Sequence, residues 1–404
     1  MSLSFLPKLK AQQTFNLSPQ ELYRKFDKLS YENPEWRQQA QSLLFEMLRY
    51  QHKIEASDLD LGGPGCRGKI WYRVYGTKAP TQKFGELDEL ETAYIVLSIL
   101  NEQQKKKFYK FKSFDFSFSF KLHQEDKKAA RFRGTIYLEQ GKLAANFRKI
   151  NTTVFSISEL GFSQQIIKRL NLRYEKFGLT LVTGLTGSGK STTLDSIIDM
   201  NNHDNEGHIV IVGNPIEYIH NSDKCIIRHR EVGNDVISFQ DGIIESLRQD
   251  PDIVVIDEIR DTEEIASLLE ITDSGHKTFS TLHTNSAIDS LHRIIAEFPP
   301  REQERIRVRL AETLSVVISQ KLIPGIDGKR ILAKEILSVD SSIRAAIINK
   351  NISEIYQMIT EGNKKGMITI EQDLANLLNK RKISLETALN FANNKKRLKQ
   401  LISL

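Results

Sequence analysis

The fold is decided by the stretch Leu179-Thr180-Leu181-Val182-Thr183-Gly184-Leu185-Thr186-Gly187-Ser188-Gly189-Lys190-Ser191-Thr192-Thr193. Its apolar first part predicts a β-strand, and the part from Gly184 has the form G-x-x-x-x-G-K-[ST] that leads into a helix. Glycines let backbone N–H groups approach phosphate oxygens, and the start of a helix adds a partial positive charge. Strand, loop and helix together are typical of a site that binds nucleotide phosphates.

The candidate phosphate-binding residues belong to this loop and the first turn of the helix: Gly184, Thr186, Gly187, Ser188, Gly189, Lys190, Ser191 and Thr192. We expect Lys190 to reach the β- and γ-phosphates of ATP and the Ser191 hydroxyl to bind Mg²⁺. The competing explanation is a glycine-rich turn that matches by accident, which happens in roughly one chain of this size in a hundred. The sequence predicts ATP and Mg²⁺ as the bound cofactors.

A second motif supplies acidic side chains. The segment Ile253–Glu258 reads IVVIDE, four apolar residues followed by two acids. Ligands of a parallel sheet lie at the carboxyl ends of its strands, so these acids are expected beside the loop. Asp257 is then a candidate to hold Mg²⁺ through water, and Glu258 to orient or deprotonate the attacking water. The alternative is that the acids cap the helix that follows.

Two further candidates end neighbouring strands. Glu217 follows the predicted strand that ends at Gly213, where a second carboxylate could position water or Mg²⁺; a structural turn glutamate is the alternative. His283 follows the predicted strand 277–282 and would lie at the γ-phosphate edge as a hydrogen-bond donor; a structural histidine with satisfied hydrogen bonds is the alternative. His276 and His283 have no third ligand in pattern, so we do not expect them to bind a metal.

Composition limits the class of protein. The chain has 404 residues, 40% hydrophobic and 27% charged, as expected for a soluble protein of two or three domains. It lacks an apolar run long enough to span a membrane and a signal-peptide pattern, and its two cysteines have no metal-ligand spacing, so we expect a cytoplasmic protein. The net charge of +6 permits contact with nucleic acid without demanding it, and no nucleic-acid partner is expected.

The pattern of apolar and polar residues along the sequence predicts the domains. Residues 1–53 form a helical N-terminal extension, and 54–150 alternate short strands with one helical stretch, which predicts an α+β module. Residues 151–161 are a linker. From 162 to 404 we expect an α/β ATPase domain whose parallel sheet is covered on both faces, followed by an almost entirely helical region beyond about residue 300, including a helix from Arg301 to Gln320.

Four blocks in this order resemble the secretion-superfamily ATPases, and most of all the PilT family of type IV pilus retraction motors: Gly184–Thr193, Asn214–Glu217, Ile256–Asp261, and Gly275-His276 through His283-Thr284. The resemblance runs from about Ala56 to the end of the chain. It implies a PAS-like N-terminal domain, a RecA-like ATPase domain, a homohexamer that hydrolyses ATP to drive pilus retraction or twitching motility, and an inner-membrane platform protein as partner. The chain would then be cytoplasmic and peripheral at the inner membrane.

The chain departs from the family pattern at four places, one of which is the N-terminal extension, residues 1–53. Asn214 stands where aspartate is usual, Asp257 stands where glycine is usual, and the arginine usual between two N-domain strands is replaced near Gly141-Lys142. Asn214 and the missing arginine keep a second hypothesis open, a weakly hydrolysing, ATP-binding regulatory paralogue of a pilus or secretion motor. A small-molecule kinase is a third reading, which the four ordered blocks and the absence of an acceptor-site motif oppose.

The N-terminal module offers arginines to the chemistry. The motor-domain motifs show no arginine at an evident γ-phosphate position, and Arg260 is expected to face the helix that begins beside it. Arg131, Arg133 and Arg148 lie on adjacent predicted strands, and strand alternation puts the first two on one face. We therefore predict that they complete the active site of a neighbouring subunit. Pairing with acids such as Asp115 is the alternative.

Overall fold

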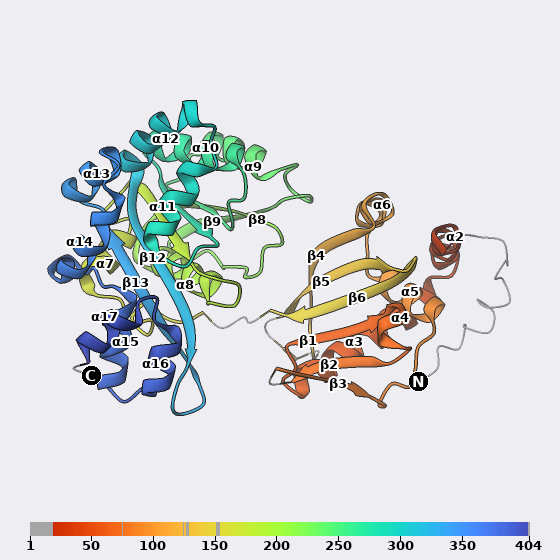
Figure 1. The fold of residues 1–404 in the computed structure, drawn as a ribbon. Helices are drawn as coiled ribbons and strands as arrows, with labels where there is room; N and C mark the ends of the chain where they lie inside the picture. The colour runs from red at the N-terminus through yellow and green to blue at the C-terminus, as the bar shows by residue number, and fades with distance from the viewer. Residues whose placement is uncertain (1–18, 75, 124, 127–128, 151–153, 403–404) are drawn as a thin grey trace. The chain divides into compact units, whose positions relative to one another are not determined.

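The computed structural model describes residues 19–74, 76–123, 125–126, 129–150 and 154–402, in two compact units, 1–152 and 153–404 (Figure 1). Part of two predicted segments lies outside the described residues: the first 18 residues of the N-terminal extension and the first three of the linker 151–161.

The first unit is built on an antiparallel sheet of six strands in the order β3-β2-β1-β6-β5-β4. The strands are β1 (Asp58–Gly62), β2 (Ile70–Val74), β3 (Thr77–Thr81), β4 (Ser113–Phe120), β5 (Ala130–Glu139) and β6 (Lys142–Lys149). Phenylalanine alternates with polar residues along β4, and Phe116 and Phe118 both pack edge-on against Phe147 of β6. The alternation of short strands predicted for residues 54–150 is therefore present, as six strands among the described residues.

Helices complete the core of the first unit. They are α2 (Pro19–Glu32), α3 (Pro34–Lys53), the short α4 (Gly63–Cys66), α5 (Glu89–Ser98) and α6 (Glu102–Phe111). The predicted helical stretch between Asp88 and Phe111 is two helices, because Asp88 and Asn101 each begin one with a reciprocal capping box. Buried residues of α3 and α5 pack into one cluster with β1, β5 and β6.

The second unit contains a seven-stranded sheet in the order β13-β12-β7-β11-β10-β8-β9, parallel except for β13. The strands are β7 (Gly178–Thr183), β8 (Gly207–Gly213), β9 (Cys225–Glu231), β10 (Ile253–Ile256), β11 (Lys277–Leu282), β12 (Leu314–Pro324) and β13 (Arg330–Ser338). β7, β8, β10 and β11 are adjacent and parallel, so the loops that follow them lie at the same edge of the sheet.

Helices cover both faces of this sheet, as the sequence predicts. On one face pack α7 (Gln164–Leu170) and α8 (Lys190–Asp204). On the other pack α9 (Phe239–Ser246), which the 3₁₀ turn η1 (Leu247–Gln249) follows, α10 (Thr262–Asp273), α11 (Ala287–Ala296), α12 (Pro300–Thr313), α13 (Ser341–Ile348) and α14 (Ile355–Glu361). Successive strand residues face opposite sides: Leu181 belongs to the α9–α14 core and Val182 to the α7–α8 core.

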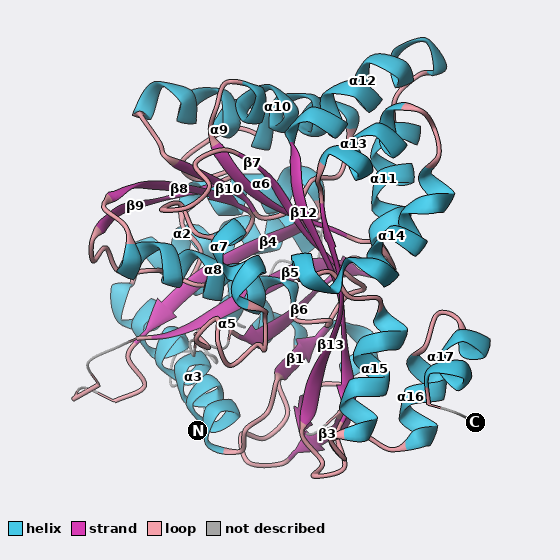
Figure 2. Cartoon of the chain, turned by 90° about the vertical axis from the view of Figure 1, so that its left-hand side faces the viewer, coloured by secondary structure: helices cyan, strands magenta, loops and turns pink. Residues whose placement is uncertain are grey.

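The predicted helix from Arg301 to Gln320 is wrong in its second half. The helix α12 ends at Thr313, and the next residues form β12 and β13, the longest strands of the sheet (Figure 2). Val316, Val317 and Ile318 are fully buried beside β7, and a short apolar run of this kind has no periodicity that separates a buried strand from a buried helix. Helices α15 (Ile370–Asn379), α16 (Leu385–Phe391) and α17 (Lys395–Leu401) then pack beside the far ends of β12 and β13.

Candidate functional site

The glycine-rich loop joins the end of β7 to the start of α8. A Cβ atom on Gly184 would lie 2.5 Å from the carbonyl oxygen of Gln320, so no larger residue fits there without movement. Gly187 and Gly189 have φ values of +79° and +87°, which side-chain-bearing residues rarely adopt. The loop therefore has the shape that its sequence pattern predicts, and it ends at the N-terminus of α8, where backbone N–H groups are available to an anion.

The Lys190 side chain is folded back over its own loop. Its Nζ donates hydrogen bonds to the carbonyl oxygens of Gly184, at 2.9 Å, and Leu185, at 3.3 Å. Burial lowers the pKa of Lys190, and the carboxylates of Glu258 and Asp257 oppose that change. Neutral carbonyl groups hold this ammonium group, so its charge remains available to a phosphate that enters the loop.

Gln320 on β12 fastens the loop, a role that sequence reasoning missed because it placed this residue at the end of a helix. Its Nε2 donates to the carbonyl oxygen of Ser188 at 2.9 Å, and its Oε1 accepts from the Thr193 hydroxyl at 3.0 Å. The side chain is almost fully buried, so these two bonds satisfy both ends of its amide. A buried glutamine among apolar strand residues was the signal in the sequence.

Carboxylates gather next to the first turn of α8. Ser191, Asp195, Glu217 and Asp257 line one small cavity of about 30 Å³. Burial, together with the nearby charges of Glu217 and Asp195, raises the pKa of Asp257 to about 7. The structure therefore brings Ser191, Glu217 and Asp257 together, as the sequence predicts for residues at one edge of the sheet.

This cavity fits a magnesium ion. A hydroxyl and crowded carboxylates are the oxygen ligands that Mg²⁺ prefers, and a cation there would offset the repulsion that raises the pKa of Asp257. The described residues contain no group of three or more His, Cys, Asp or Glu side chains arranged to hold a metal on their own. Mg²⁺ in nucleotide sites is usually bound through one or two carboxylates together with phosphate oxygens and water.

Asp195 and His220 are further site residues that sequence reasoning missed. Asp195 lies one helical turn beyond Ser191 on α8, and its Oδ1 is 3.1 Å from Nε2 of His220. The imidazole is buried, and Tyr218 packs edge-on against it with ring centroids 4.5 Å apart. The i,i+4 spacing from Ser191 to Asp195 was the available signal, since residues four apart share one face of a helix.

Both carboxylate oxygens of Glu258 are engaged. Oε2 accepts from Nε and Nη2 of Arg260, at 3.0 and 2.8 Å, and Oε1 lies 3.0 Å from Nε2 of His283. The expectation that Arg260 faces the following helix is wrong: its backbone N–H bonds to Glu264 on α10, whereas its guanidinium group turns back to Glu258. Two groups therefore fix the orientation of the Glu258 carboxylate beside the loop.

His283 bridges Lys190 and Glu258. Its Nδ1 is 3.3 Å from Nζ of Lys190, which can only donate, so Nδ1 accepts and Nε2 carries the hydrogen that points to Glu258. Burial lowers the pKa of His283, and the charge of Lys190 lowers it further, which favours this neutral form. His276 lies before β11, at the opposite end of the strand, where its Nδ1 contacts the Ser274 hydroxyl.

The predicted trans-acting arginines have partners inside the first unit. Arg133 forms an ion pair with Asp115 at 3.0 Å, and Arg148 forms one with Asp58 at 2.9 Å. Arg131 donates to the hydroxyls of Ser117 and Ser119 on β4, at 2.7 and 3.3 Å. Arg131 and Arg133 thus lie on one face of β5, as predicted, and the pairing with acids that was the alternative occurs within this unit.

Comparison with known proteins places this geometry in a family. The family model described as "Type II/IV secretion system protein" matches residues 135–396. The chain is 37% identical to the type IV pilus retraction ATPase PilT of Pseudomonas aeruginosa over 343 residues, 85% of this chain and 96% of that protein. It is 36% identical to a twitching motility protein of Neisseria gonorrhoeae over 310 residues, 76% of this chain and 80% of that protein.

A solved structure agrees with these relatives. The pilus retraction motor PilT with bound ADP superposes with a TM-score of 0.78 at 33% identity, over 88% of this chain and 98% of that one. The resemblance seen in the motifs and the expected α/β fold with a RecA-like ATPase domain are confirmed. Among the described helices, none combines the length and apolar character needed to cross a membrane. By motif order, fold and sequence, this chain belongs to the type II/IV secretion system protein family of ATPases.

Proposed function

We propose that this chain is a Mg²⁺-dependent ATPase of the PilT type, a hexameric motor that powers type IV pilus retraction or twitching motility. The convergence of Lys190, Glu258 and His283 at neighbouring strand ends carries the proposal. In P-loop ATPases the lysine neutralises charge on the transferring phosphoryl group, and an acidic residue at the next strand end orients the attacking water. The names of the PilT and twitching relatives support the direction of movement.

The cavity beside α8 gives each residue a role. The backbone N–H groups of the loop and Lys190 bind the phosphates, and Ser191 and Asp257 hold Mg²⁺. The bound ion would neutralise charge that develops between the β- and γ-phosphates. Glu258 takes the proton of the attacking water once one of its two partners releases it, and Glu217 holds a water molecule from the opposite wall.

Assembly and location are part of this proposal. We assign residues 54–150 to a PAS-like domain and 162–404 to the RecA-like domain with its C-terminal helices, with 1–53 as an extension and 151–161 as the linker. Six copies form a ring, and Arg131, Arg133 and Arg148 of one copy complete the site of the next. The ring works in the cytoplasm against an inner-membrane platform protein of the pilus machine, with no nucleic acid as partner.

The alternative of a weakly hydrolysing regulatory paralogue is not favoured. It rested on Asn214 and on the missing N-domain arginine, yet Glu217 lines the cavity beside Ser191 and Asp257. Lys190, His283 and Glu258 also form a continuous set of contacts, which supports an ATPase over a chain that binds ATP and hydrolyses it poorly.

The test combines turnover with motility. Purified chain should hydrolyse ATP in the presence of Mg²⁺, and a Lys190→Ala chain should not. In a twitching bacterium without its own retraction ATPase, the wild-type chain should restore twitching and the Lys190→Ala chain should not. ATP hydrolysis without restored twitching would leave an ATPase that serves another machine, and absence of hydrolysis by assembled wild-type rings would overturn the proposal.

A further inference from the structure

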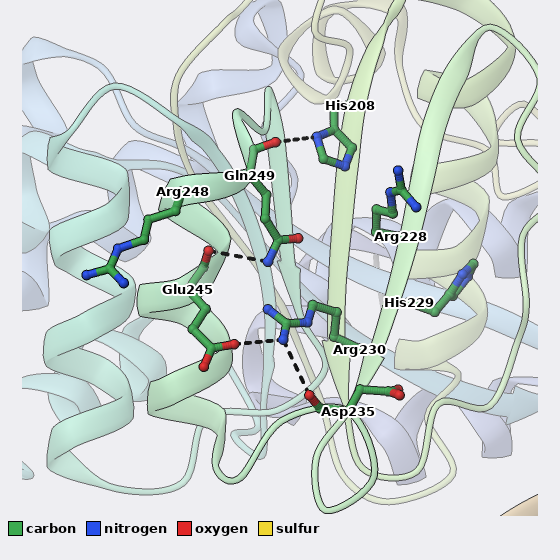
Figure 3. Close-up of a pocket in the computed structure, with 8 residues that line it drawn as sticks. All are labelled: His208, Arg228, His229, Arg230, Asp235, Glu245, Arg248 and Gln249. Atoms are coloured by element: carbon green, nitrogen blue, oxygen red, sulfur yellow. Dashed lines mark hydrogen bonds and ion pairs between the residues drawn. The ribbon is translucent and has the colours of Figure 1, made fainter.

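A second cavity, much larger than the one beside α8, lies at the edge strand β9 of the seven-stranded sheet (Figure 3). It has a volume of about 780 Å³ and extends along β9 toward α9 and the turn that follows α9. Its lining is almost entirely charged or polar: His208, Arg228, His229, Arg230, Asp235, Glu245, Arg248 and Gln249. The ATPase chemistry derived above gives none of these residues a role.

Two of its three arginines form no ion pair with the described residues. The guanidinium groups of Arg228 and Arg248 are exposed and make no hydrogen bond or ion pair with any residue in the described part of the chain. Arg230 reaches from β9 to Glu245 on α9 at 2.7 Å (Figure 3). The other acid, Asp235, accepts the backbone N–H of Glu231 at 2.8 Å. Both acids of the lining are therefore already engaged.

A histidine adds an unused polar atom. Nδ1 of His208 is 2.9 Å from the carbonyl oxygen of Gln249, and because a carbonyl only accepts, Nδ1 carries the hydrogen. Nε2 of the same ring is buried and has no hydrogen-bond partner among the described residues.

We propose that this cavity binds a small ligand that carries at least two phosphate groups. Its volume is within the range of small-molecule sites, and a single phosphate would leave most of it unfilled. Guanidinium groups match phosphate oxygens with paired N–H donors, and Arg228 has those donors free in the described structure. The site is distinct from the nucleotide loop, because His208 lies at the amino end of β8 and the loop lies at the carboxyl ends of the strands.

Histidine contacts connect this cavity to the nucleotide site. His229 of the cavity wall accepts the backbone N–H of His220 at Nε2, at 3.1 Å, and the two rings are nearly parallel with centroids 6.2 Å apart. His220 in turn contacts Asp195, which together with Ser191 lines the small cavity beside α8. A ligand that shifts β9 therefore acts on a wall of the nucleotide site, so the proposal includes an effect on nucleotide release.

Binding is tested with pyrophosphate, titrated calorimetrically into the full chain with saturating ADP to occupy the glycine-rich loop. We expect one additional site, weakened about tenfold or more by Arg228→Gln, which removes one charge-assisted contact. Arg173→Gln is the matched control, because Arg173 is also an exposed motor-domain arginine whose side chain has no described partner. No binding by the ADP-saturated wild type, or equal binding by wild type and Arg228→Gln, would overturn the site.

Two further experiments distinguish lipid headgroups from a free ligand as the source of the phosphate groups. Phosphatidylglycerol vesicles that pull down wild type but not Arg228→Gln would identify lipid headgroups as the phosphate source; pyrophosphate binding without vesicle binding would identify a free ligand. Light scattering checks the remaining possibility: if Arg228→Gln alone changes the oligomeric state, the surface is a contact between copies and the ligand proposal fails.

The connection has its own readout. A fluorescent ADP analogue, chased with excess ADP, should leave the wild-type chain at a different rate when pyrophosphate is present, and Arg228→Gln should lose that difference. Direct competition cannot produce this result, because the chase already blocks rebinding. An unchanged dissociation rate while pyrophosphate is bound would refute the connection through His229 and His220.

Discussion

The imidazole of His283 donates from Nε2 to a carboxylate oxygen of Glu258, 3.0 Å away, while its Nδ1 faces the ammonium group of Lys190. The group expected to bind phosphate and the group expected to activate water are therefore joined through one ring. A phosphate that attracts the Lys190 ammonium group would remove the hydrogen bond that Nδ1 of His283 accepts. The contact of the same ring with Glu258 would then change as well. We therefore expect His283 to couple the binding of the γ-phosphate at Lys190 to the position of Glu258.

Lys190→Ala should lower ATP turnover by about a hundredfold or more, because neutralising charge on the transferring phosphoryl group is a main part of catalysis. Folding should survive, since Nζ bonds mainly to carbonyl oxygens of its own surface loop. Steady-state hydrolysis and thermal melting measure the two effects. Lys176→Ala, at an exposed lysine of the same unit, is the control; normal hydrolysis by Lys190→Ala would place the active site elsewhere.

Glu258→Gln should keep ATP binding and lose hydrolysis, because it preserves the shape of the side chain but removes the charge that polarises water. Glu217→Gln should slow turnover less, since Glu258 is the acid that contacts His283, whereas Glu217 lines the cavity with Ser191 and Asp257. Comparing the two rates at saturating ATP tests the assignment. A harmless Glu258→Gln would make Glu217 the base.

Gln320→Leu should destabilise the motor domain and loosen the nucleotide loop. The change leaves the Ser188 carbonyl and the Thr193 hydroxyl without their buried partner, at about 1–3 kcal/mol for each unpaired group. The denaturant concentration at the midpoint of unfolding should decrease, and so should the affinity for ADP. Gln303→Leu is a control on α12, where the amide makes a single bond to Phe298. Unchanged ADP affinity in a folded Gln320→Leu chain would show that the two hydrogen bonds of Gln320 have no effect on the nucleotide loop.

Gln320 also shows what the sequence could and could not predict. The strand, loop and helix around Lys190, and the acids after β10, were predictable because each motif is local and its neighbours in sequence are its neighbours in space. The β12 strand was not, because its apolar run is compatible with helix until β7 is known to lie beside it. The contact between Glu258 and Arg260 was also not predictable, because the sequence does not show whether the Arg260 side chain points to the following helix or back to Glu258.

Glu335 gives a prediction about pH. Burial raises its pKa to about 7 from an ordinary value near 4.5, although the backbone N–H of Ala287 donates to it at 2.8 Å. Above pH 7 the folded chain holds a buried charge that the unfolded chain exposes to water, and below about pH 4.5 the carboxyl is neutral in both. Glu335→Gln should therefore raise the melting temperature above pH 7, with the gain disappearing as the pH falls toward 4.5.

Melting curves of wild type and variant between pH 4.5 and 8 measure this effect. The glutamine oxygen can still accept the bond from Ala287, so packing is preserved. Glu297→Gln removes a charge from an exposed position of the same unit and should give no pH-dependent difference. A constant difference between Glu335→Gln and wild type across the whole range would mean that Glu335 does not titrate there.

Arg133 provides the test of a site shared between subunits. In one chain its guanidinium group pairs with Asp115, and both side chains are partly exposed, so the pair contributes little stability and can be exchanged for a phosphate. An arginine supplied in trans can raise the rate of phosphoryl transfer by about 10³ or more. Rings of Arg133→Ala should therefore bind ATP and hydrolyse it slowly.

Asp115→Asn is the matched variant, because it breaks the same ion pair and leaves the charge of Arg133 in place. If Arg133 only stabilises its own domain, the two variants should have similar turnover and similar melting temperatures. If it acts on a neighbouring phosphate, Asp115→Asn should keep turnover and Arg133→Ala should lose it. Mixed rings of Arg133→Ala and Lys190→Ala subunits should then regain part of the rate, because each supplies the half that the other lacks. Mixed rings that assemble and stay inactive would contradict the shared site.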